Sequence, residues 1–312
     1  MKRKILITGA AGFIGGHLYD ECERLGWEVI GIDNFSHPSE HPKNGRVKYA
    51  DIRYYHDIEP FVKEVDVVAH LAAQIHVDKS ILNPQETIDT NVTGTLNVLE
   101  AVRVHNKHMV FASSSEVYGT SQAPFISELH PLDAQSPYAA SKVAGDRLCL
   151  AYYHTYGTKV SILRNFNTFG PYQNDASYGG VIAIFTKKAL ENDTLNIFGS
   201  GDQRRDYMHV KDAVRAYLFC VEKELWGEPI NIGTGQTITI NELAKEIVSY
   251  TNSKSDIQHT VARPGEVQRL CADTTKAVVK GFVGTTDFIK DLHLYIDFCK
   301  AKKKGESYEE TN

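Results

Sequence analysis

The sequence has few of the features that mark secreted, membrane or nucleic-acid-binding proteins. Five of its 312 residues are cysteine, an odd and scattered set that predicts free thiols in a reducing compartment instead of disulfides or a metal site. The first apolar stretch meets Gly9 after a few residues, so no signal peptide or membrane span is expected. A net charge of −5 argues against a nucleic-acid or membrane-surface partner. The composition therefore predicts a cytoplasmic protein without a metal.

A glycine-rich turn follows the first predicted strand. Lys4–Thr8 (KILIT) is a short apolar run typical of a buried parallel strand. Three glycines follow it at once: Gly9, Gly12 and Gly15. Before the amphipathic segment 13–25, this spacing allows a tight turn and close backbone approach to a pyrophosphate at a helix N-terminus. The next strand, Glu28–Ile32, ends at Asp33, where an acid can bond adenosine ribose hydroxyls and repel a 2′-phosphate. The pattern therefore predicts a dinucleotide site that favours NAD over NADP.

Strands and helices alternate through most of the chain. Further strands are predicted over 47–50, 65–70, 109–113, 159–164 and 228–233, with a long helix over 87–105. This alternation predicts an α/β fold with a Rossmann-type, doubly wound parallel sheet, whose ligands bind beyond the carboxyl ends of the strands. The residues expected at that edge are Gly9, Asp33, His70, Ser114 and the start of the helix that carries Tyr138.

A tyrosine and a lysine stand four residues apart in the segment SPYAASK. Ser136 suits a helix N-cap and Pro137 suits the first helical position. Tyr138 and Lys142 then share one helix face. Since a nearby ammonium favours the phenolate, we expect Lys142 to lower the pKa of Tyr138 from about 10. The pair predicts a general base at the sheet edge.

Several motifs together resemble the extended short-chain dehydrogenase/reductase family. They are GAAGFIG, the acid Asp33, Asp51-Ile52, HLAAQ, TNVTGTLNVLEA, SSSEVYG and SPYAASK. More narrowly, nearly the whole chain is similar to that family's nucleotide-sugar epimerases, dehydratases and decarboxylases. The resemblance implies NAD as cofactor, a nucleotide-diphosphate sugar oxidised at C4, and a homodimer built on the helix 87–105 and the Tyr138 helix. Apolar residues at helical spacing fit an interface and equally a core: Ala144, Leu148, Ala151 and Tyr152.

The resemblance also implies roles for single residues. Tyr138 takes the proton of the C4 hydroxyl, Ser114 bonds the same hydroxyl, and Lys142 bonds the nicotinamide ribose. The implied cofactor-binding residues are Gly9, Gly12, Phe13, Ile14, Gly15, Asp33, Asn34, Asp51, Ile52, Leu71, Ala72, Ala73 and Asn91, with Tyr138 and Lys142. The implied substrate-binding residues are Asn167, Val181, Arg205, Arg263 and Glu266. Two arginines suit a diphosphate, because the guanidinium fork matches phosphate oxygens.

Glu116, two residues after Ser114, bears on the reaction. In the 4,6-dehydratases of the family a glutamate here removes the C5 proton, whereas simple 4-epimerases usually carry a small or neutral residue. We therefore predict a 4,6-dehydratase, in which water leaves across C5–C6 and hydride returns to C6, with the pKa of Glu116 raised by burial. Ser115 stands where some dehydratases carry an aspartate acid, and a serine there is shared with GDP-mannose-type dehydratases and decarboxylases.

Alternatives stay open for the reaction. In a 4-epimerase, Glu116 is a structural acid turned away from the sugar. In a UDP-glucuronate decarboxylase, Arg204 would hold the sugar carboxylate, and a 5,6-dehydratase also keeps the glutamate. A non-catalytic NAD-binding sensor is least favoured, because such modules usually lose the Tyr/Lys pair. For Arg205 the structural alternative is a surface ion pair with Asp206.

The chain is predicted to form two domains. Residues 1–167 form the NAD-binding domain, and a segment near 206–236 returns to add its last strand. Residues 168–205 and 237–300 form a smaller α/β domain for the nucleotide sugar. Residues 301–312 are charged and are predicted to be a solvated tail.

Overall fold

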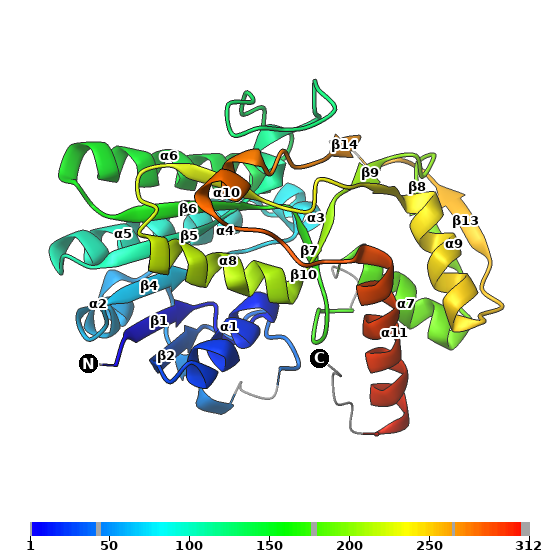
Figure 1. The fold of residues 1–312 in the computed structure, drawn as a ribbon, viewed down its shortest axis with the longest axis horizontal. Helices are drawn as coiled ribbons and strands as arrows, with labels where there is room; N and C mark the ends of the chain where they lie inside the picture. Colours follow the sequence, from blue (N-terminus) through cyan, green and yellow to red (C-terminus); the bar gives the residue numbers. More distant parts are fainter. Residues whose placement is uncertain (1, 42–44, 176–179, 264–265, 307–312) are drawn as a thin grey trace.

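A seven-stranded parallel sheet lies at the centre of the protein (Figure 1), in the order β11-β6-β5-β4-β1-β2-β3. The computed structural model describes residues 2–41, 45–175, 180–263 and 266–306. The strands are β1 (Lys4–Thr8), β2 (Glu28–Asp33), β3 (Lys48–Tyr49), β4 (Val67–His70), β5 (His108–Ser114), β6 (Val160–Asn165) and β11 (Pro229–Ile232). The strand order reverses between β1 and β4, which makes their carboxyl ends a topological switch point. The predicted Rossmann-type α/β fold is confirmed.

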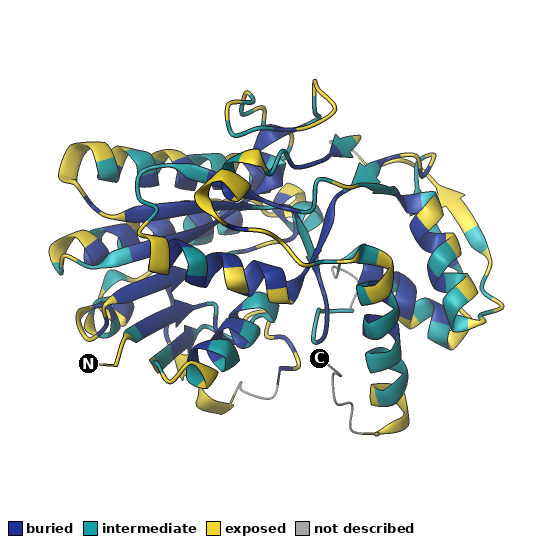
Figure 2. Cartoon of the chain, viewed as in Figure 1, coloured by how far each residue is buried: buried dark blue, intermediate teal, exposed yellow. Residues whose placement is uncertain are grey.

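Helices cover both faces of this sheet. One face packs against α1 (Phe13–Arg24) and α8 (Val210–Lys223), and the other against α2 (Tyr55–Lys63), α5 (Gly94–Val104) and α6 (Pro137–Tyr156). Side chains alternate between the two cores along each strand, so Ile5 and Ile7 of β1 join one and Leu6 joins the other. Figure 2 shows the strands buried between these helices. Burial on both faces explains why the strands read as continuous apolar runs.

The predicted helix over 87–105 is interrupted. After α3 (Val77–Leu82), the chain forms α4 (Pro84–Ile88), a π-helical turn η2 (Asp89–Thr93), and then α5. The turn contains Asn91, whose buried side chain points inward. Such π-turns insert one extra residue and re-aim a side chain, which periodicity in the sequence does not reveal.

A second group of elements, all from the chain after β6, packs at one end of the sheet (Figure 1) around a core of its own. Its small sheets pair β7 (Asn167–Phe169) with β10 (Tyr207–His209), β9 (Arg204–Arg205) with β12 (Ile238–Thr239) and β14 (Arg269–Leu270), and β8 (Leu195–Phe198) with β13 (Ile257–Thr260). Its helices are α7 (Val181–Glu191), α9 (Ile240–Thr251) and α11 (Phe288–Lys304), and α10 (Thr275–Lys280) packs beside β11. No helix in the described ranges is long and apolar enough to cross a membrane. The domain boundaries stay a prediction.

The predicted tail begins too early. Helix α11 continues through Lys304 and ends at Gly305, whose φ of +73° suits glycine. Residues 307–312 of the predicted tail lie outside the described residues. The run of lysines is therefore helical, and its positive charge lies at the helix C-terminus, where it complements the helix dipole.

A buried carboxylate on α8 holds the segment that leads into α11. Asp212 is 1% exposed, and it accepts hydrogen bonds from the backbone N–H groups of Thr285 (2.6 Å) and Thr286 (2.7 Å). The hydroxyls of both threonines and Nη1 of Arg215 donate to it as well. Burial raises the pKa of Asp212, but the hydrogen bonds from Thr286 and Thr285 outweigh it and lower the pKa overall.

Substitution Asp212→Asn should lower the free energy of unfolding by about 3 kcal/mol at neutral pH. The carboxylate accepts hydrogen bonds at both of its oxygens, whereas an asparagine amide has only one acceptor oxygen. Since the folded-state pKa lies below the unfolded value, this stabilisation is present above about pH 4 and is lost as pH falls through the folded pKa. Urea unfolding at several pH values measures the difference, with the exposed Asp193→Asn as control. A difference that persists unchanged in acid would contradict the assignment.

Candidate active site

A cavity of about 660 Å³ opens at the carboxyl edge of the sheet. Its lining residues follow the ends of β1, β2, β4, β5 and β6, and others come from β7, α7, β8 and the segment around Arg263. The volume falls in the range of small-molecule sites. The cavity therefore lies where an open parallel sheet binds its ligands, as the sequence predicts.

The glycine-rich turn forms one end of the cavity. Gly9 has φ +74°, and a Cβ there would lie 2.7 Å from the backbone nitrogen of Ala72. A Cβ on Gly15 would lie 2.1 Å from the carbonyl oxygen of Gly9. Only glycine fits these two positions, and together they bring the N-terminus of α1 to the cavity wall. Gly12, Phe13 and Ile14 of the predicted set also line the cavity.

Asp33 lies at the end of β2 and lines the cavity. It accepts hydrogen bonds from the backbone N–H groups of Phe35 (2.8 Å) and Ala11 (3.1 Å). Burial raises the pKa of Asp33, and these hydrogen bonds oppose that rise. Of the neighbouring predicted residues, Asn34 and Ile52 line the cavity. Asp51 is not among the lining residues, and its buried carboxylate lies 2.6 Å from Nη2 of Arg53.

His70, which was expected at this edge, and Asn91, which was implied to bind the cofactor, have structural partners instead. His70 is buried, and its ring nitrogens bond the hydroxyls of Thr8 (2.8 Å) and Thr95 (3.0 Å). Burial lowers the pKa of His70 to about 3, so its ring is neutral. Asn91 bonds the backbone of Gln74 and the hydroxyl of Ser141 (2.8 Å), and neither His70 nor Asn91 lines the described cavity. Leu71, Ala72 and Ala73 after β4 do line it.

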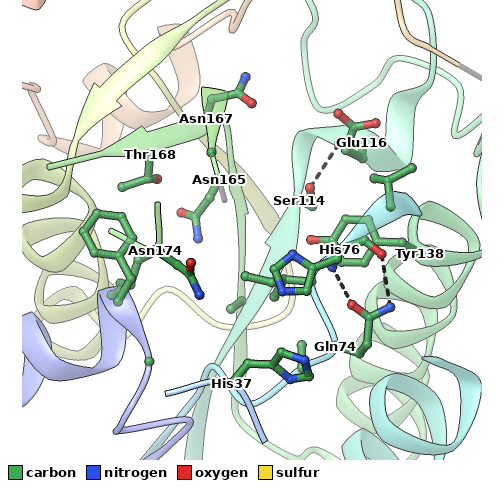
Figure 3. Close-up of a pocket in the computed structure, with 18 of the residues that line it drawn as sticks. His37, Gln74, His76, Ser114, Glu116, Tyr138, Asn165, Asn167, Thr168 and Asn174 are labelled. Atoms are coloured by element: carbon green, nitrogen blue, oxygen red, sulfur yellow. Dashed lines mark hydrogen bonds between the residues drawn. The ribbon is translucent and has the colours of Figure 1, made fainter. Parts of the chain in front are cut away.

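Helix α6 brings the tyrosine and lysine to the cavity. The Ser136 hydroxyl accepts from the Ala139 N–H at 3.1 Å and Pro137 begins the helix, which confirms the predicted start. Tyr138 and Lys142 both line the cavity, and Nζ of Lys142 donates to the carbonyl oxygen of Ala112 at 2.9 Å. Figure 3 shows Tyr138 beside Ser114, which lies at the end of β5.

The predicted effect of Lys142 on Tyr138 is not found in the protein alone. Burial raises the pKa of Tyr138 to about 12, and its hydrogen bond with Ser114 only partly opposes this. Burial likewise lowers the pKa of Lys142 to about 8. Both charged forms are disfavoured because both groups lie in a dry interior, a cost that helical spacing does not reveal.

Glu116 lies on a 3-10 turn, η3 (Ser115–Tyr118), directly after β5. Its backbone N–H donates to the Ser114 hydroxyl at 3.2 Å, and its side chain lines the cavity. Burial raises the pKa of Glu116, Arg205 opposes the rise, and Glu266 adds to it. In Figure 3 Ser114 lies between Glu116 and Tyr138. Ser115 is 3% exposed and does not line the described cavity, so the structure does not bring it to the site.

The two consecutive arginines of β9 differ in position. Arg205 lines the cavity, and its charge acts on Glu116. Arg204 is not among the described lining residues, as expected for alternate positions of a strand. Asp206 is fully buried and accepts from Thr234 and from the backbone of Gly235 and Ala272, not from Arg205. The alternative of a surface Arg205–Asp206 pair is therefore wrong.

The remaining predicted substrate residues line the same cavity: Asn167, Val181, Arg263 and Glu266. The guanidinium of Arg263 lies 3.9 Å over the ring centre of Phe198 and 3.5 Å from Asp78 of α3. Glu266 accepts from Nε2 of Gln203 at 3.1 Å. The residues between them, 264 and 265, lie outside the described part of the chain.

Sequence reasoning missed several polar residues of the cavity. Tyr207 on β10 is 5% exposed, and its hydroxyl has no hydrogen-bond partner among the described residues. Asn165 ends β6 and donates to the Tyr217 hydroxyl at 2.9 Å. Asn165 could have been found as a polar residue at the carboxyl end of a strand. Tyr207 could not, because only the pairing of β10 with β7 brings it to the cavity.

Relatives of this chain carry names for different reactions on nucleotide sugars. A putative UDP-glucose 4-epimerase of Methanocaldococcus jannaschii is 36% identical, over 95% of this chain and 98% of its own. A UDP-N-acetyl-alpha-D-glucosaminuronate decarboxylase of Bacillus cytotoxicus is 38% identical, over 83% and 84%. The solved UDP-glucose 4-epimerase of Thermotoga maritima, with UDP-glucose, matches with a TM-score of 0.92 and 31% identity, over 96% and 99%.

A family model described as the NAD dependent epimerase/dehydratase family matches residues 5–233. The match begins in β1 and ends directly after β11, so it spans the whole central sheet. NAD is the cofactor of this family. The chain belongs to the NAD-dependent epimerase/dehydratase family of enzymes that act on nucleotide sugars.

Proposed function

We propose that this protein is a nucleotide-sugar 4,6-dehydratase. The observation that carries the proposal is a half-buried carboxyl, Glu116, beside Ser114 in the cavity, with its pKa raised by burial. A carboxyl with a raised pKa can take and return a proton near neutral pH. An epimerase needs no such group, because its 4-keto sugar only rotates in the site and takes hydride on its other face.

The residues present fit the NAD of the family. The glycine turn, where a Cβ has no room, suits a pyrophosphate at the start of α1, and Asp33 suits the adenosine ribose. Lys142 would bond the nicotinamide ribose, at the end of the cavity that Tyr138 lines. When bound, NAD supplies the acceptor for the hydride from C4 and the donor for the later reduction at C6.

The chain's own residues move the protons. Tyr138 takes the proton of the C4 hydroxyl, which Ser114 holds by a hydrogen bond. The C4 ketone acidifies the C5 hydrogen, and Glu116 removes it as a proton. The C6–O bond then breaks, and the protonated Glu116 returns its proton to the leaving hydroxyl, which departs as water. Ser115 cannot supply this proton, since it lies outside the cavity lining. When hydride returns to C6, C5 takes a proton from solvent water through Glu116, and Tyr138 releases the proton of the C4 hydroxyl to solvent.

The diphosphate of the substrate would lie beside Arg205 and Arg263. Both line the cavity, and each can bind phosphate oxygens through its guanidinium. Figure 3 shows Asn165, Asn167 and Thr168 on the wall opposite Ser114, Glu116 and Tyr138. Asn167 and Val181 would complete the nucleotide-diphosphate contacts, and Glu266 the contact to the nucleotide ribose.

Two of the alternatives are less well supported. A decarboxylase needs a cation for the sugar carboxylate, and its candidate Arg204 is not among the described residues of the cavity. A non-catalytic module has no use for Ser114, Tyr138 and Lys142 side by side. A 4-epimerase remains the competing function, in which Glu116 serves only to balance the charge of Arg205.

The test is a panel of UDP-, dTDP-, GDP- and CDP-sugars incubated with the purified protein and read by mass spectrometry. A product lighter by one water supports the proposal and identifies the nucleotide. An unchanged mass with inversion at C4 by NMR overturns it in favour of the epimerase. Loss of carbon dioxide from a uronic acid overturns it in favour of a decarboxylase.

We also propose a homodimer built on α5 and α6. Tyr152 donates to Glu100 and Arg103 lies over Tyr156, so the two helices run side by side in the same direction. One turn earlier on each helix lie Leu96, which is 37% exposed, and the half-buried Leu148. A second copy of the chain would cover these two leucines.

Substitution of both Leu96 and Leu148 by glutamate should therefore convert the dimer to a monomer in sedimentation experiments. Leu129→Glu is the matched control, because this leucine is 95% exposed and lies outside α5 and α6. A wild-type protein that is monomeric at micromolar concentration would exclude this interface.

A further inference from the structure

A buried ion pair joins the helix that carries Tyr138 to strand β6. Asp146 on α6 is fully buried and Arg164 on β6 is 1% exposed. Nη2 of Arg164 lies 2.6 Å from Oδ2 of Asp146, and Nε donates to the same oxygen at 2.7 Å. A buried pair contributes little net stability, because the desolvation of both charges offsets their attraction. The pair therefore calls for an explanation beyond stability.

Asp146 lies one helical turn after Lys142, so the two residues share a face of α6. Burial lowers the pKa of Lys142, and the charge of Asp146 opposes this loss of the proton. Arg164 in turn neutralises part of the charge of Asp146. The proton affinity of Lys142 therefore depends on how much of the charge of Asp146 is neutralised by Arg164.

The other titratable groups around Lys142 and Tyr138 do not replace Asp146. They are Cys149 on α6, His70 on β4, Glu116 on η3 and Tyr217 on α8. Burial keeps the Cys149 thiol, the His70 ring and the Tyr217 phenol neutral near pH 7. The charge of Glu116 acts on Tyr138, the other member of the tyrosine–lysine pair.

The same guanidinium also holds the turn that carries Glu116. Nη1 of Arg164 donates to the hydroxyl of Tyr118 at 2.8 Å, and Cζ lies 4.9 Å over the Tyr118 ring. The Tyr118 hydroxyl donates onward to Oδ1 of Asn231 at 2.6 Å. Tyr118 is the last residue of η3, so one buried arginine connects α6, η3 and β11.

We propose that Asp146 and Arg164 are positioning residues for the proton-transfer pair of this enzyme. Asp146 keeps Lys142 charged, and Arg164 limits that effect while it fixes η3, and with it Glu116, relative to α6. The inference rests on the proposed oxidation at C4 with Tyr138 as the base, and it holds whether or not water is then lost.

The test compares Asp146→Asn, Arg164→Gln and the double variant. In Asp146→Asn the charge of Arg164 is unopposed. The apparent pKa values of Tyr138 and Lys142, which set the two limbs of the bell-shaped pH profile of kcat, should then both fall by about one pH unit. In Arg164→Gln both should rise. In the double variant, which removes both charges, they should return toward those of the wild type.

Two further measurements keep the test decisive. Ultraviolet titration of the Tyr138 phenolate in the NAD-loaded protein, with Tyr138→Phe as blank, reports the same shifts without a substrate. It therefore separates this inference from the proposed function, which fails if no nucleotide sugar turns over. Arg147→Gln, an exposed charge on the same helix, should shift neither value.

Unmoved pH limbs in Asp146→Asn, with only a loss of rate or stability, would overturn the proposal and make the pair structural. Arg164→Gln leaves Asp146 unpaired and is the variant at risk of not folding. In that case the comparison of Asp146→Asn with the double variant still decides.

Discussion

The Tyr138→Phe enzyme is expected to bind NAD and the nucleotide sugar normally and to turn over roughly 10³-fold more slowly. The lost hydroxyl is the group that takes the C4 proton, and a positioned general base contributes on the order of 10²- to 10⁴-fold. The ring itself stays in place, because Tyr138 is packed in the wall of the cavity and loses only its oxygen. Steady-state kinetics should therefore show a fall in kcat with little change in KM.

The control for Tyr138→Phe is Tyr153→Phe, which removes a hydroxyl from the same helix outside the cavity lining. Its rate should match the wild type. If Tyr138→Phe retains more than about a tenth of the rate, another group takes the C4 proton and the assigned base is wrong.

The Glu116→Gln enzyme should lose the release of water by at least about 10²-fold while it still oxidises the sugar at C4. The amide fills the same space but cannot accept the C5 proton. We expect the absorbance of the reduced cofactor to build up with substrate, and exchange of the C5 hydrogen with solvent deuterium to stop. These two readouts separate the loss of the base from a loss of binding.

The pH dependence of the same step has a definite sign. Glu116 must be ionised to accept a proton, and burial raises its pKa above that of an ordinary glutamate. The rate of C5 exchange should therefore fall as pH decreases through this raised pKa, at a higher pH than a solvent-exposed carboxyl would give. A Glu116→Gln enzyme with the full rate would instead indicate the epimerase, with Glu116 as a structural acid.

Residue types and their spacing in the sequence were sufficient to predict the strand, turn and helix that position the site. The apolar run before Gly9 predicts a buried strand, and the glycine spacing predicts the turn that the close contacts of Gly9 and Gly15 require. Ser136 and Pro137 predict the start of α6, and the four-residue spacing then places Tyr138 and Lys142 on one face. These features depend on residues close together in the chain, so periodicity and capping determine them.

The direction and protonation of single side chains depended on contacts between distant segments. The pairing of β9 with β12 and β14 brings Arg205 to the cavity, and Asn91 on the π-turn binds Gln74 and Ser141 instead of lining it. Burial reverses the expected pKa of Tyr138, because desolvation outweighs what the lysine spacing suggests.

The sequence by itself therefore determined the alternation of strands and helices, the glycine turn and the tyrosine–lysine helix of this protein, because each follows from residues near one another in the chain. Only the tertiary structure decided which of the predicted residues share one cavity and how burial shifts their proton affinities. The physical reason is that desolvation and strand pairing act between segments far apart in sequence, such as Asp146 on α6 and Arg164 on β6.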